Sequence, residues 1–404
     1  MAPLIPVDEA LARILGHARP VTQDETVPLT EADGRVLARD LAARLTQPPF
    51  DASAMDGYAV RAADAPDGAE LAVVGVSAAG ASWPRTLEAG QAVRIFTGAP
   101  VPAGADSVVI QENTATLRNG LIRVTAAAAP GANIRRRGQD FAEGEVLFTA
   151  GTVMDFTRLT LAAAMDHGVL AVRRRPLVAV LATGDELVRP GEPRSPDQIV
   201  ASSIYGMAAF VKAAGADVLD LGIARDTEAD IAAAARRAAD AGADVLVTMG
   251  GASVGDHDLV QPVLKKIGME LDFWRIAMRP GKPLMVGRLG GMQVLGLPGN
   301  PVSTLVCSLL FLEPLIRKLA GLPPVPRLAT AVAGADLPAN DHRQDYMRAR
   351  LETGSGGERV VFAAPRQDSS QMKVLARSDC LVIRPPHAPA LAAGSPCPVL
   401  LIRP

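Results

Sequence analysis

Residues 177–320 alternate short apolar runs with longer amphipathic segments, and this alternation constrains the fold more than any other feature of the chain. The runs LVAVLAT, ADVLDLG and ADVLVTMG have the length and β-branched content of strands, whereas IVASSIYGMAAFVKAAG and TEADIAAAARRAADAG have the length and spacing of helices. Later strands are expected at PLMVGRL and MQVLGLP, and a closing helix at residues 301–319. Because strands that alternate with helices form right-handed βαβ units, the pattern predicts a doubly wound α/β domain with a parallel sheet at residues 177–322.

The segments on either side of this region have a different pattern of apolar residues. Residues 43–140 contain short apolar runs broken by Gly and Pro, which predicts a β-rich insert domain. Residues 323–404 return to short runs such as CLVIRP and CPVLLIRP, which predict a small C-terminal β-barrel. Residues 1–42 and 141–176 are helical or mixed and bracket the insert, so we expect them to form one discontinuous domain.

The composition is that of a folded protein without a large basic surface. Hydrophobic residues make up 49% of the 404 residues, charged residues 21%, and the net charge is −2. These values argue against disorder and against nucleic acid or an anionic membrane as the partner. The start of the chain lacks the pattern of a signal peptide, and no apolar segment reaches the roughly 18 residues of a membrane span. Since the three cysteines have neither metal nor disulfide spacing, we expect a cytoplasmic protein.

Four loops are expected at one edge of the α/β sheet, beyond the carboxyl ends of its strands, where such sheets bind ligands. Their sequences are TGDEL, ARDT, MGGASVGDHD and LPGNP. Taken singly, each is also explained as a turn or as the start of a helix. MGGASVGDHD is the most specific, because Gly250 and Gly251 followed by Ser253 would expose the backbone N–H groups that a phosphate requires. Four such loops on one edge favour a binding site.

Acidic side chains gather in the same loops. Glu186, Asp226, Asp256 and Asp258 would repel one another without a cation, and a hard divalent ion such as Mg²⁺ would relieve that repulsion. His257 is interpreted as an exposed loop residue, since no second histidine stands at metal-ligand spacing. The residues alone do not decide which acid would bind the metal and which would act on water.

Cationic side chains follow, and they suggest an anionic substrate. The run FWRIAMRPGKPL supplies Arg275, Arg279 and Lys282. In the C-terminal region, HRQDYMRARL and PRQDSSQMKVLARSD contain guanidinium and hydroxyl donors that could hold an oxyanion. Carboxylates, cations and a glycine-serine loop together favour a phosphorylated substrate that is processed with the help of a metal.

The insert contributes three further polar runs. PPFDASAMDGYAV contains Asp56, FTGAPVPAGADSVV contains Thr97, and ANIRRRGQDF contains three arginines before Asp140. The arginines fit a solvated edge strand, but the glycine that follows them would also allow close approach of a ligand or a partner backbone.

Seven of these motifs occur in an order that resembles the molybdopterin molybdenumtransferase family, which includes bacterial MoeA and the gephyrin E domain. They are FDASAMDGYAV, TGAPVPAGAD, RRRGQDF, ATGDEL, GGASVGDHD, MRPGKPL and LPGNPVS, and the similarity spans nearly the whole chain. The resemblance implies an enzyme of molybdenum cofactor biosynthesis that inserts molybdenum from molybdate into adenylylated molybdopterin, with Mg²⁺-dependent release of AMP. It also implies an elongated four-domain homodimer, in which the insert of one subunit approaches the molybdopterin-binding-like α/β domain of the other.

The resemblance assigns roles to individual residues. It implies that the catalytic residues are Glu186, Asp226 and Asp258 of the α/β domain, which are also the expected metal ligands, and Asp56, Thr97 and Asp140 of the insert. The residues expected around the substrates are Gly250, Gly251, Ser253, Arg275, Arg279, Lys282, Pro298, Pro301, Ser303, Arg343, Arg348 and Ser369. Family members often carry lysine where this chain has Arg275 and Arg279, which keeps the charge but alters the donor geometry.

The resemblance also suggests partners and leaves two rival functions. The suggested partners are the adenylyltransferase that supplies the substrate and the molybdenum enzymes that receive the product. One rival is molybdopterin adenylyltransferase activity, which needs neither the long β insert nor the barrel. The other is a non-enzymatic scaffold of the gephyrin type, against which the complete set of expected site residues argues.

Overall fold

The computed structural model describes residues 4–251 and 259–404, which separate into two units. The first unit contains residues 4–24 with the described part of residues 173–404, and the second contains residues 25–172.

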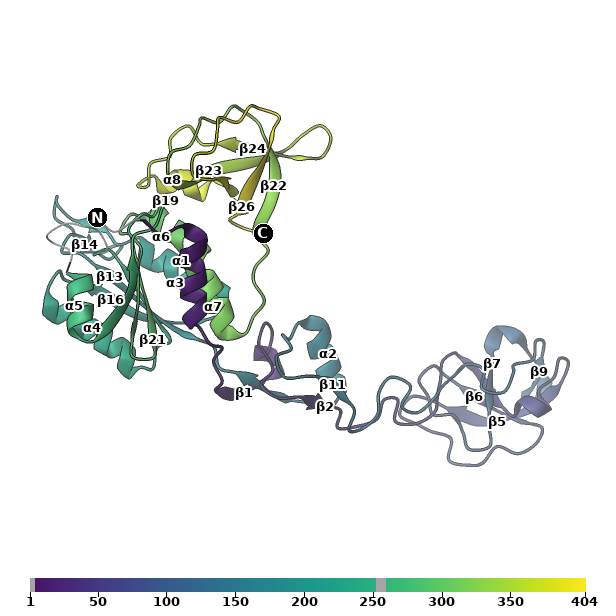
Figure 1. The fold of residues 1–404 in the computed structure, drawn as a ribbon. Coiled ribbons are helices and arrows are strands. Elements are labelled where there is room, and N and C mark those ends of the chain that lie inside the picture. The colour runs from purple at the N-terminus through teal and green to yellow at the C-terminus, as the bar shows by residue number, and fades with distance from the viewer. Residues whose placement is uncertain (1–3, 252–258) are drawn as a thin grey trace. The chain divides into compact units, whose positions relative to one another are not determined.

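A six-stranded sheet with helices on both faces forms the α/β part of the first unit (Figure 1). The strand order is β16-β13-β17-β21-β20-β18. The parallel strands are β13 (Leu177–Thr183), β16 (Asp217–Ala224), β17 (Val245–Met249) and β21 (Met292–Leu297). The antiparallel strands are β20 (Met285–Leu289) and β18 (Met269–Trp274). The parallel pairing predicted from the strand-helix alternation is found among the four parallel strands but not at this edge, because β20 and β21 are joined by a tight turn at Gly290, with φ of +61°, instead of a helix.

Alternate residues of β13 are buried on opposite faces of the sheet. Val178 and Val180 pack with one group of helices, and Ala179 and Leu181 pack with another. The first group is α1 (Val7–His17), α3 (Ser203–Ala214), α6 (Pro301–Cys307) and α7 (Glu313–Ala320), and the second is α4 (Glu228–Asp240) and α5 (Val260–Lys266). The sequence predicted one helix over residues 301–319. In the structure a π-helical segment, Ser308–Leu312, interrupts it just before Pro314, whose ring nitrogen cannot donate a hydrogen bond.

The C-terminal strands close into a five-stranded barrel, as the sequence predicted. The closed order is β23-β24-β22-β26-β25, with β25 pairing back to β23. The strands are β22 (Leu328–Ala333), β23 (Gln344–Thr353), β24 (Arg359–Ala363), β25 (Cys380–Arg384) and β26 (Pro396–Leu401), and α8 (Met372–Ala376) lies between β24 and β25 in the chain. The short strand β19 (Met278–Arg279) follows the α/β strand β18 in the chain and pairs with β23. Backbone hydrogen bonds therefore join the barrel to the α/β part of the same unit.

The second unit is β-rich and has its own small cores. A six-stranded sheet has the order β7-β4-β6-β5-β9-β8. Its strands are β4 (Gly57–Val60), β5 (Glu70–Ser77), β6 (Gln91–Ile95), β7 (Ser107–Ile110), β8 (Thr114–Thr116) and β9 (Leu121–Val124). Shorter pairings join β2 (Leu41–Ala42) to β11 (Val146–Phe148) and β3 (Ala52–Ser53) to β10 (Ile134–Arg135), and α2 (Phe156–Ala164) is capped by Asp155. The predicted β-rich insert is confirmed, whereas the four domain boundaries stay predictions.

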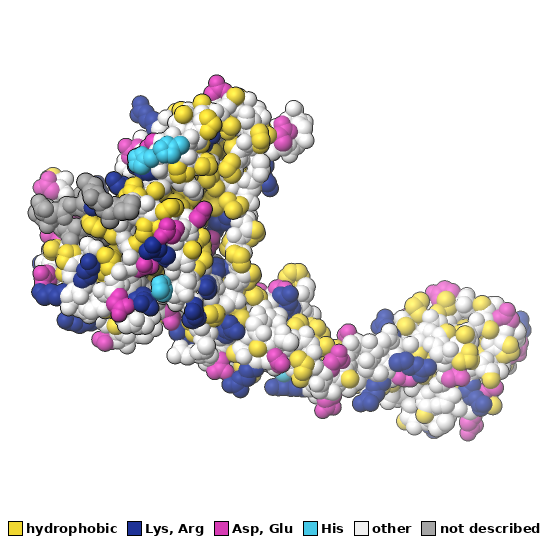
Figure 2. Space-filling model, in the orientation of Figure 1, with side chains coloured by type: hydrophobic (Ala, Val, Ile, Leu, Met, Phe, Trp, Pro, Cys, Tyr) yellow, Lys and Arg dark blue, Asp and Glu magenta, His cyan; other side chains and the backbone are white. Residues whose placement is uncertain are grey.

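Two whole-chain properties bear on possible partners. Within the described residues, no helix combines the length and apolar character of a membrane span. Basic and acidic side chains are interspersed on the visible face of the molecule (Figure 2), in keeping with the small net charge.

Candidate functional site

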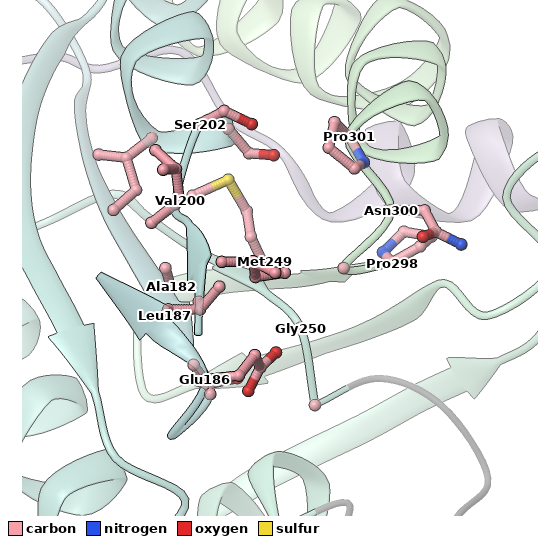
Figure 3. A pocket seen from close by; sticks show the side chains of 18 of the residues that line it. Ala182, Glu186, Leu187, Val200, Ser202, Met249, Gly250, Pro298, Asn300 and Pro301 are labelled. Carbon is pink, nitrogen blue, oxygen red and sulfur yellow. The ribbon is translucent and has the colours of Figure 1, made fainter. Parts of the chain in front are cut away.

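A cavity of about 540 Å³ lies at the carboxyl ends of the parallel strands. All four of the predicted loops contribute to its lining: Gly184 and Glu186 from TGDEL, Asp226 from ARDT, Gly250 and Gly251 from MGGASVGDHD, and Pro298, Asn300 and Pro301 from LPGNP. In Figure 3, Ser202 and Pro301 lie at one end of the cavity and Glu186 and Gly250 at the other. The structure therefore brings these loops together around one space, at the edge where ligands of α/β sheets bind.

The turn after β17 is built in a way that only glycine allows. Gly250 and Gly251 have φ of +99° and +62°. A Cβ on Gly250 would lie 2.7 Å from the carbonyl oxygen of Thr183, and one on Gly251 would lie 2.2 Å from a methyl carbon of Val260. The backbone N–H of Gly250 donates to the carbonyl of Leu297 at 3.2 Å. This donor is thus engaged within the protein, which removes it from the expected phosphate cradle.

Two of the four predicted acidic residues, Glu186 and Asp226, are described by the structure, and the other two lie outside the described residues. Glu186 and Asp226 both line the cavity. The Glu186 carboxylate folds back over Gly184, where an added Cβ would lie 2.5 Å from one of its oxygens. Ser253, Asp256, His257 and Asp258 lie outside the described residues. Within residues 4–251 and 259–404, no three acidic, histidine or cysteine side chains form a group that could hold a metal ion.

The three cations predicted around the substrate, Arg275, Arg279 and Lys282, are not among the residues that line the cavity. The Arg275 guanidinium carbon lies 4.4 Å from the ring centre of Trp274, and Arg275 has φ of +82°. Arg279 donates from Nε to Asp345 at 3.0 Å, and this ion pair lines a second cavity of about 480 Å³ beside the barrel. Lys282 is exposed. Ser303 is buried inside α6 and likewise does not line the first cavity.

Two predicted arginines of the barrel are tied to its own loops. Arg348 is fully buried and donates from Nε to the side chain of Gln367 at 3.0 Å and from Nη1 to the Asp368 carbonyl at 3.1 Å. The guanidinium group and the backbone N–H of Arg343 donate to the Asp341 carboxylate at 2.9 and 2.8 Å. These two hydrogen bonds lower the pKa of Asp341 to about 2. One guanidinium nitrogen of each arginine, Nε of Arg343 and Nη2 of Arg348, is buried without a hydrogen-bond partner in the described structure.

Ser369 is brought to the rim of the α/β cavity. Its hydroxyl oxygen accepts a hydrogen bond from the side-chain amide of Asn300 at 3.1 Å, and Asn300 lines the cavity. The adjacent carbonyl of Asp368 is held by Arg348. A barrel loop and an α/β loop are therefore in direct contact at the site.

The predicted insert residues belong to the second unit. The Asp56 carboxylate accepts from the backbone N–H of Thr97 at 2.7 Å and from its hydroxyl at 2.8 Å, and these hydrogen bonds hold the pKa of Asp56 below its usual range. Asp140 is exposed. The three arginines are exposed, and Arg135 belongs to a two-stranded sheet, which fits the solvated edge strand. Within the run, the Arg136 side chain and the Arg137 backbone donate to Asp51 at 2.7 and 2.8 Å.

Several lining residues carried no recognisable signal in the sequence. Ser202 and Ser203 line the cavity at the start of α3, where the sequence shows an ordinary helix start. Asn300 was within a predicted loop, but its contact with Ser369 joins positions 69 residues apart, and no local pattern reports such a contact. Thr183 also lines the cavity; it begins the predicted loop TGDEL, but no role was expected for its side chain.

An α/β sheet with a cavity at its carboxyl edge, in a chain that also contains a β-barrel and a β-rich unit, defines a multidomain protein whose cavity lies where α/β sheets bind ligands. Three family models match the chain: the MoeA N-terminal region (domain I and II) at residues 5–165, a probable molybdopterin binding domain at residues 179–318, and the MoeA C-terminal region (domain IV) at residues 330–402. The chain belongs to the molybdopterin molybdenumtransferase family.

Individual relatives agree with this assignment over nearly their full lengths. The molybdopterin molybdenumtransferase of Haemophilus influenzae is 35% identical and is covered over 97% of both chains. That of Bacillus subtilis is also 35% identical, over 99% of this chain and 94% of its own. The crystal structure of the molybdopterin biosynthesis MoeA protein from Pyrococcus horikoshii superposes with a TM-score of 0.84 at 29% identity, covering 100% of both chains.

Proposed function

We propose that this chain inserts molybdenum from molybdate into adenylylated molybdopterin and releases AMP, as a step of molybdenum cofactor biosynthesis. The observation that carries the proposal is the convergence of four loops on one cavity of about 540 Å³, a volume suited to a cofactor-sized ligand, in a chain of this family. The names of the relatives support the molybdenum-transferring activity.

The charges of the cavity support a requirement for Mg²⁺. Its lining contains the carboxylates of Glu186 and Asp226 and, in the described part of the chain, no lysine or arginine. A phosphorylated ligand would be repelled by such a wall, and a hard divalent cation with oxygen ligands fits between the two. Glu186 and Asp226 would hold the ion, with Asp258 from outside the described residues. When bound, Mg²⁺ would neutralise charge on the phosphates of the adenylate.

The barrel supports a site for the oxyanion. Arg343 Nε and Arg348 Nη2 are buried donors without a partner among the described residues, and Ser369 adds a hydroxyl at the cavity rim. A tetrahedral oxyanion such as molybdate offers acceptors that would satisfy such donors. These side chains would position molybdate next to the pterin, so that the protein's contribution is orientation and charge compensation.

The remaining parts of the proposal concern assembly and location. We place a homodimer with a shared active site in the cytoplasm, supplied by the adenylyltransferase that makes its substrate and serving molybdenum enzymes downstream. The basis for the proposed dimer is membership of the molybdopterin molybdenumtransferase family, whose resemblance implies a homodimer. Asp56, Thr97 and Asp140 would then act on the cavity of the partner subunit.

Incubation of the purified protein with adenylylated molybdopterin, molybdate and Mg²⁺ tests the proposed function. We expect AMP release together with reconstitution of an apo-molybdoenzyme, and loss of both when Mg²⁺ is chelated. AMP release without active cofactor would reduce the activity to hydrolysis of the adenylate and contradict molybdenum insertion. A matched assay with ATP and molybdopterin separates the rival adenylyltransferase activity.

A further inference from the structure

Thr183 is the last residue of β13, and its hydroxyl group is buried without a partner. The residue is 5% exposed and lines the α/β cavity. Its Oγ1 atom makes no hydrogen bond to any residue that the structure describes. A buried hydroxyl that makes no hydrogen bond is unfavourable, because on folding it loses its hydrogen bonds with water and gains none within the protein. Valine has nearly the same shape and would fill this strand position without that loss.

The glycine turn lies directly over this hydroxyl. A Cβ built on Gly250 would be 3.0 Å from Thr183 Oγ1, and a Cβ built on Gly251 would be 3.1 Å from the same atom. Because Gly250 and Gly251 have no side chains, the backbone of this turn can pack closely against the Thr183 hydroxyl. Ser202 and Ser203 add two more hydroxyl groups to the lining of the same cavity.

We infer that Thr183 is a substrate-binding residue, whose hydroxyl donates a hydrogen bond to a phosphate oxygen of the phosphorylated pterin substrate. The inference rests on the proposed function, and it names a contact that the glycine loop was expected to make. Since the N–H of Gly250 is already bonded to Leu297, a hydroxyl on the neighbouring strand is a suitable replacement donor. Bound phosphate would give this hydroxyl the hydrogen-bond acceptor that it lacks in the described structure.

Thr248 provides a matched control in the adjacent strand. It lies in β17, which pairs in parallel with β13, and it is fully buried. Its Oγ1 also makes no hydrogen bond within the described residues, but Thr248 does not line the cavity. Both threonines are buried in the same sheet with hydroxyl groups that have no partner among the described residues, and only Thr183 is among the residues that line the cavity.

The test compares Thr183→Val, Thr183→Ser and Thr248→Val in the full-length protein. Binding of adenylylated molybdopterin is measured by fluorescence titration with Mg²⁺ present, and the Tm is measured with and without the ligand. We expect Thr183→Val to raise the Kd about tenfold while the Tm without ligand stays unchanged or rises. Thr183→Ser, which keeps the hydroxyl, and Thr248→Val should bind within about twofold of the wild type.

Two results would overturn the inference while leaving the proposed function intact. One is wild-type affinity in Thr183→Val. The other is an equal loss of affinity in Thr183→Val and Thr248→Val, which would assign the effect to packing of the sheet. Failure of the wild-type protein to bind adenylylated molybdopterin would instead refute the proposed function, and the inference with it.

Discussion

At the scale of single residues, the site depends on positions where a side chain would collide with a neighbouring strand or helix. Gly251 combines a left-handed backbone with a Cβ direction that points into Val260 of α5. Gly290 has almost the same φ, +61°, but a Cβ there would meet nothing within 4 Å. Comparing substitutions at these two glycines separates the free-energy cost of the left-handed backbone conformation from the cost of a steric clash.

We expect Gly251→Ala to lower the free energy of unfolding by about 2–4 kcal/mol, and Gly290→Ala by about 1 kcal/mol. The left-handed conformation disfavours alanine at both positions, but only residue 251 also displaces a packed side chain. Urea denaturation of both variants measures the difference. Equal losses would mean that Val260 moves aside without cost.

Thr227 shows at the scale of one element how local chemistry sets a boundary. Thr227 is the N-cap of α4, where its hydroxyl oxygen accepts a hydrogen bond from the backbone N–H of Asp230 at 3.2 Å. Thr227→Ala should therefore lower the free energy of unfolding by about 1 kcal/mol. Thr227→Ser keeps the capping hydroxyl and should retain most of this stabilisation. Urea denaturation checks the prediction, and an equal effect of the two substitutions would contradict the capping role.

Elements with a local signal were predictable, and elements set by distant contacts were not. The strand-helix alternation indicated β13, α3 and α4, because both faces of that sheet are buried and both periods are visible in the sequence. The antiparallel direction of β20 was not predicted, since apolar runs look alike in parallel and antiparallel sheets, and β18 was not predicted as a strand.

The candidate site divides in the same way. Glu186, Asp226 and the glycine turn stand in loops whose composition is unusual, and the structure places them around one cavity. Arg275 and Arg279 were expected beside the ligand from their charge and from the family resemblance. Their actual partners, the Trp274 ring and Asp345, are chosen by backbone geometry and by a barrel strand that begins 65 residues beyond Arg279.

At the scale of the whole molecule, one buried ion pair joins the α/β part of the first unit to its barrel. Arg327 donates from Nε to Glu313 of α7 at 2.5 Å and from Nη1 to the carbonyls of Leu401 and Ile402 at 2.9 and 2.6 Å. Both side chains are nearly buried, with 12% and 8% exposure. A single guanidinium thus fixes a helix of the sheet layer and the end of the last barrel strand.

Removal of one partner should be costly, because the other charge stays buried. We expect Arg327→Met to lower the free energy of unfolding by about 3–5 kcal/mol, and the double variant Arg327→Met with Glu313→Leu to recover most of it. The exposed pair Arg288–Glu270 in the same unit is the control, and Arg288→Met should cost less than about 1 kcal/mol. Chemical denaturation monitored by tryptophan fluorescence measures all three variants. No recovery in the double variant would refute the assignment of the loss to an unpaired charge.

The hydrogen bond between Asn300 and Ser369 has a consequence for the history of the chain. Donor and acceptor belong to separately matched regions, the molybdopterin binding domain and the MoeA C-terminal region. A substitution at either position deprives the other of its partner. Among descendants of a common ancestor, the two positions should therefore change together. A chimera that combines an α/β domain and a barrel from different lineages would then lack a matching hydrogen-bond pair at the edge of the cavity.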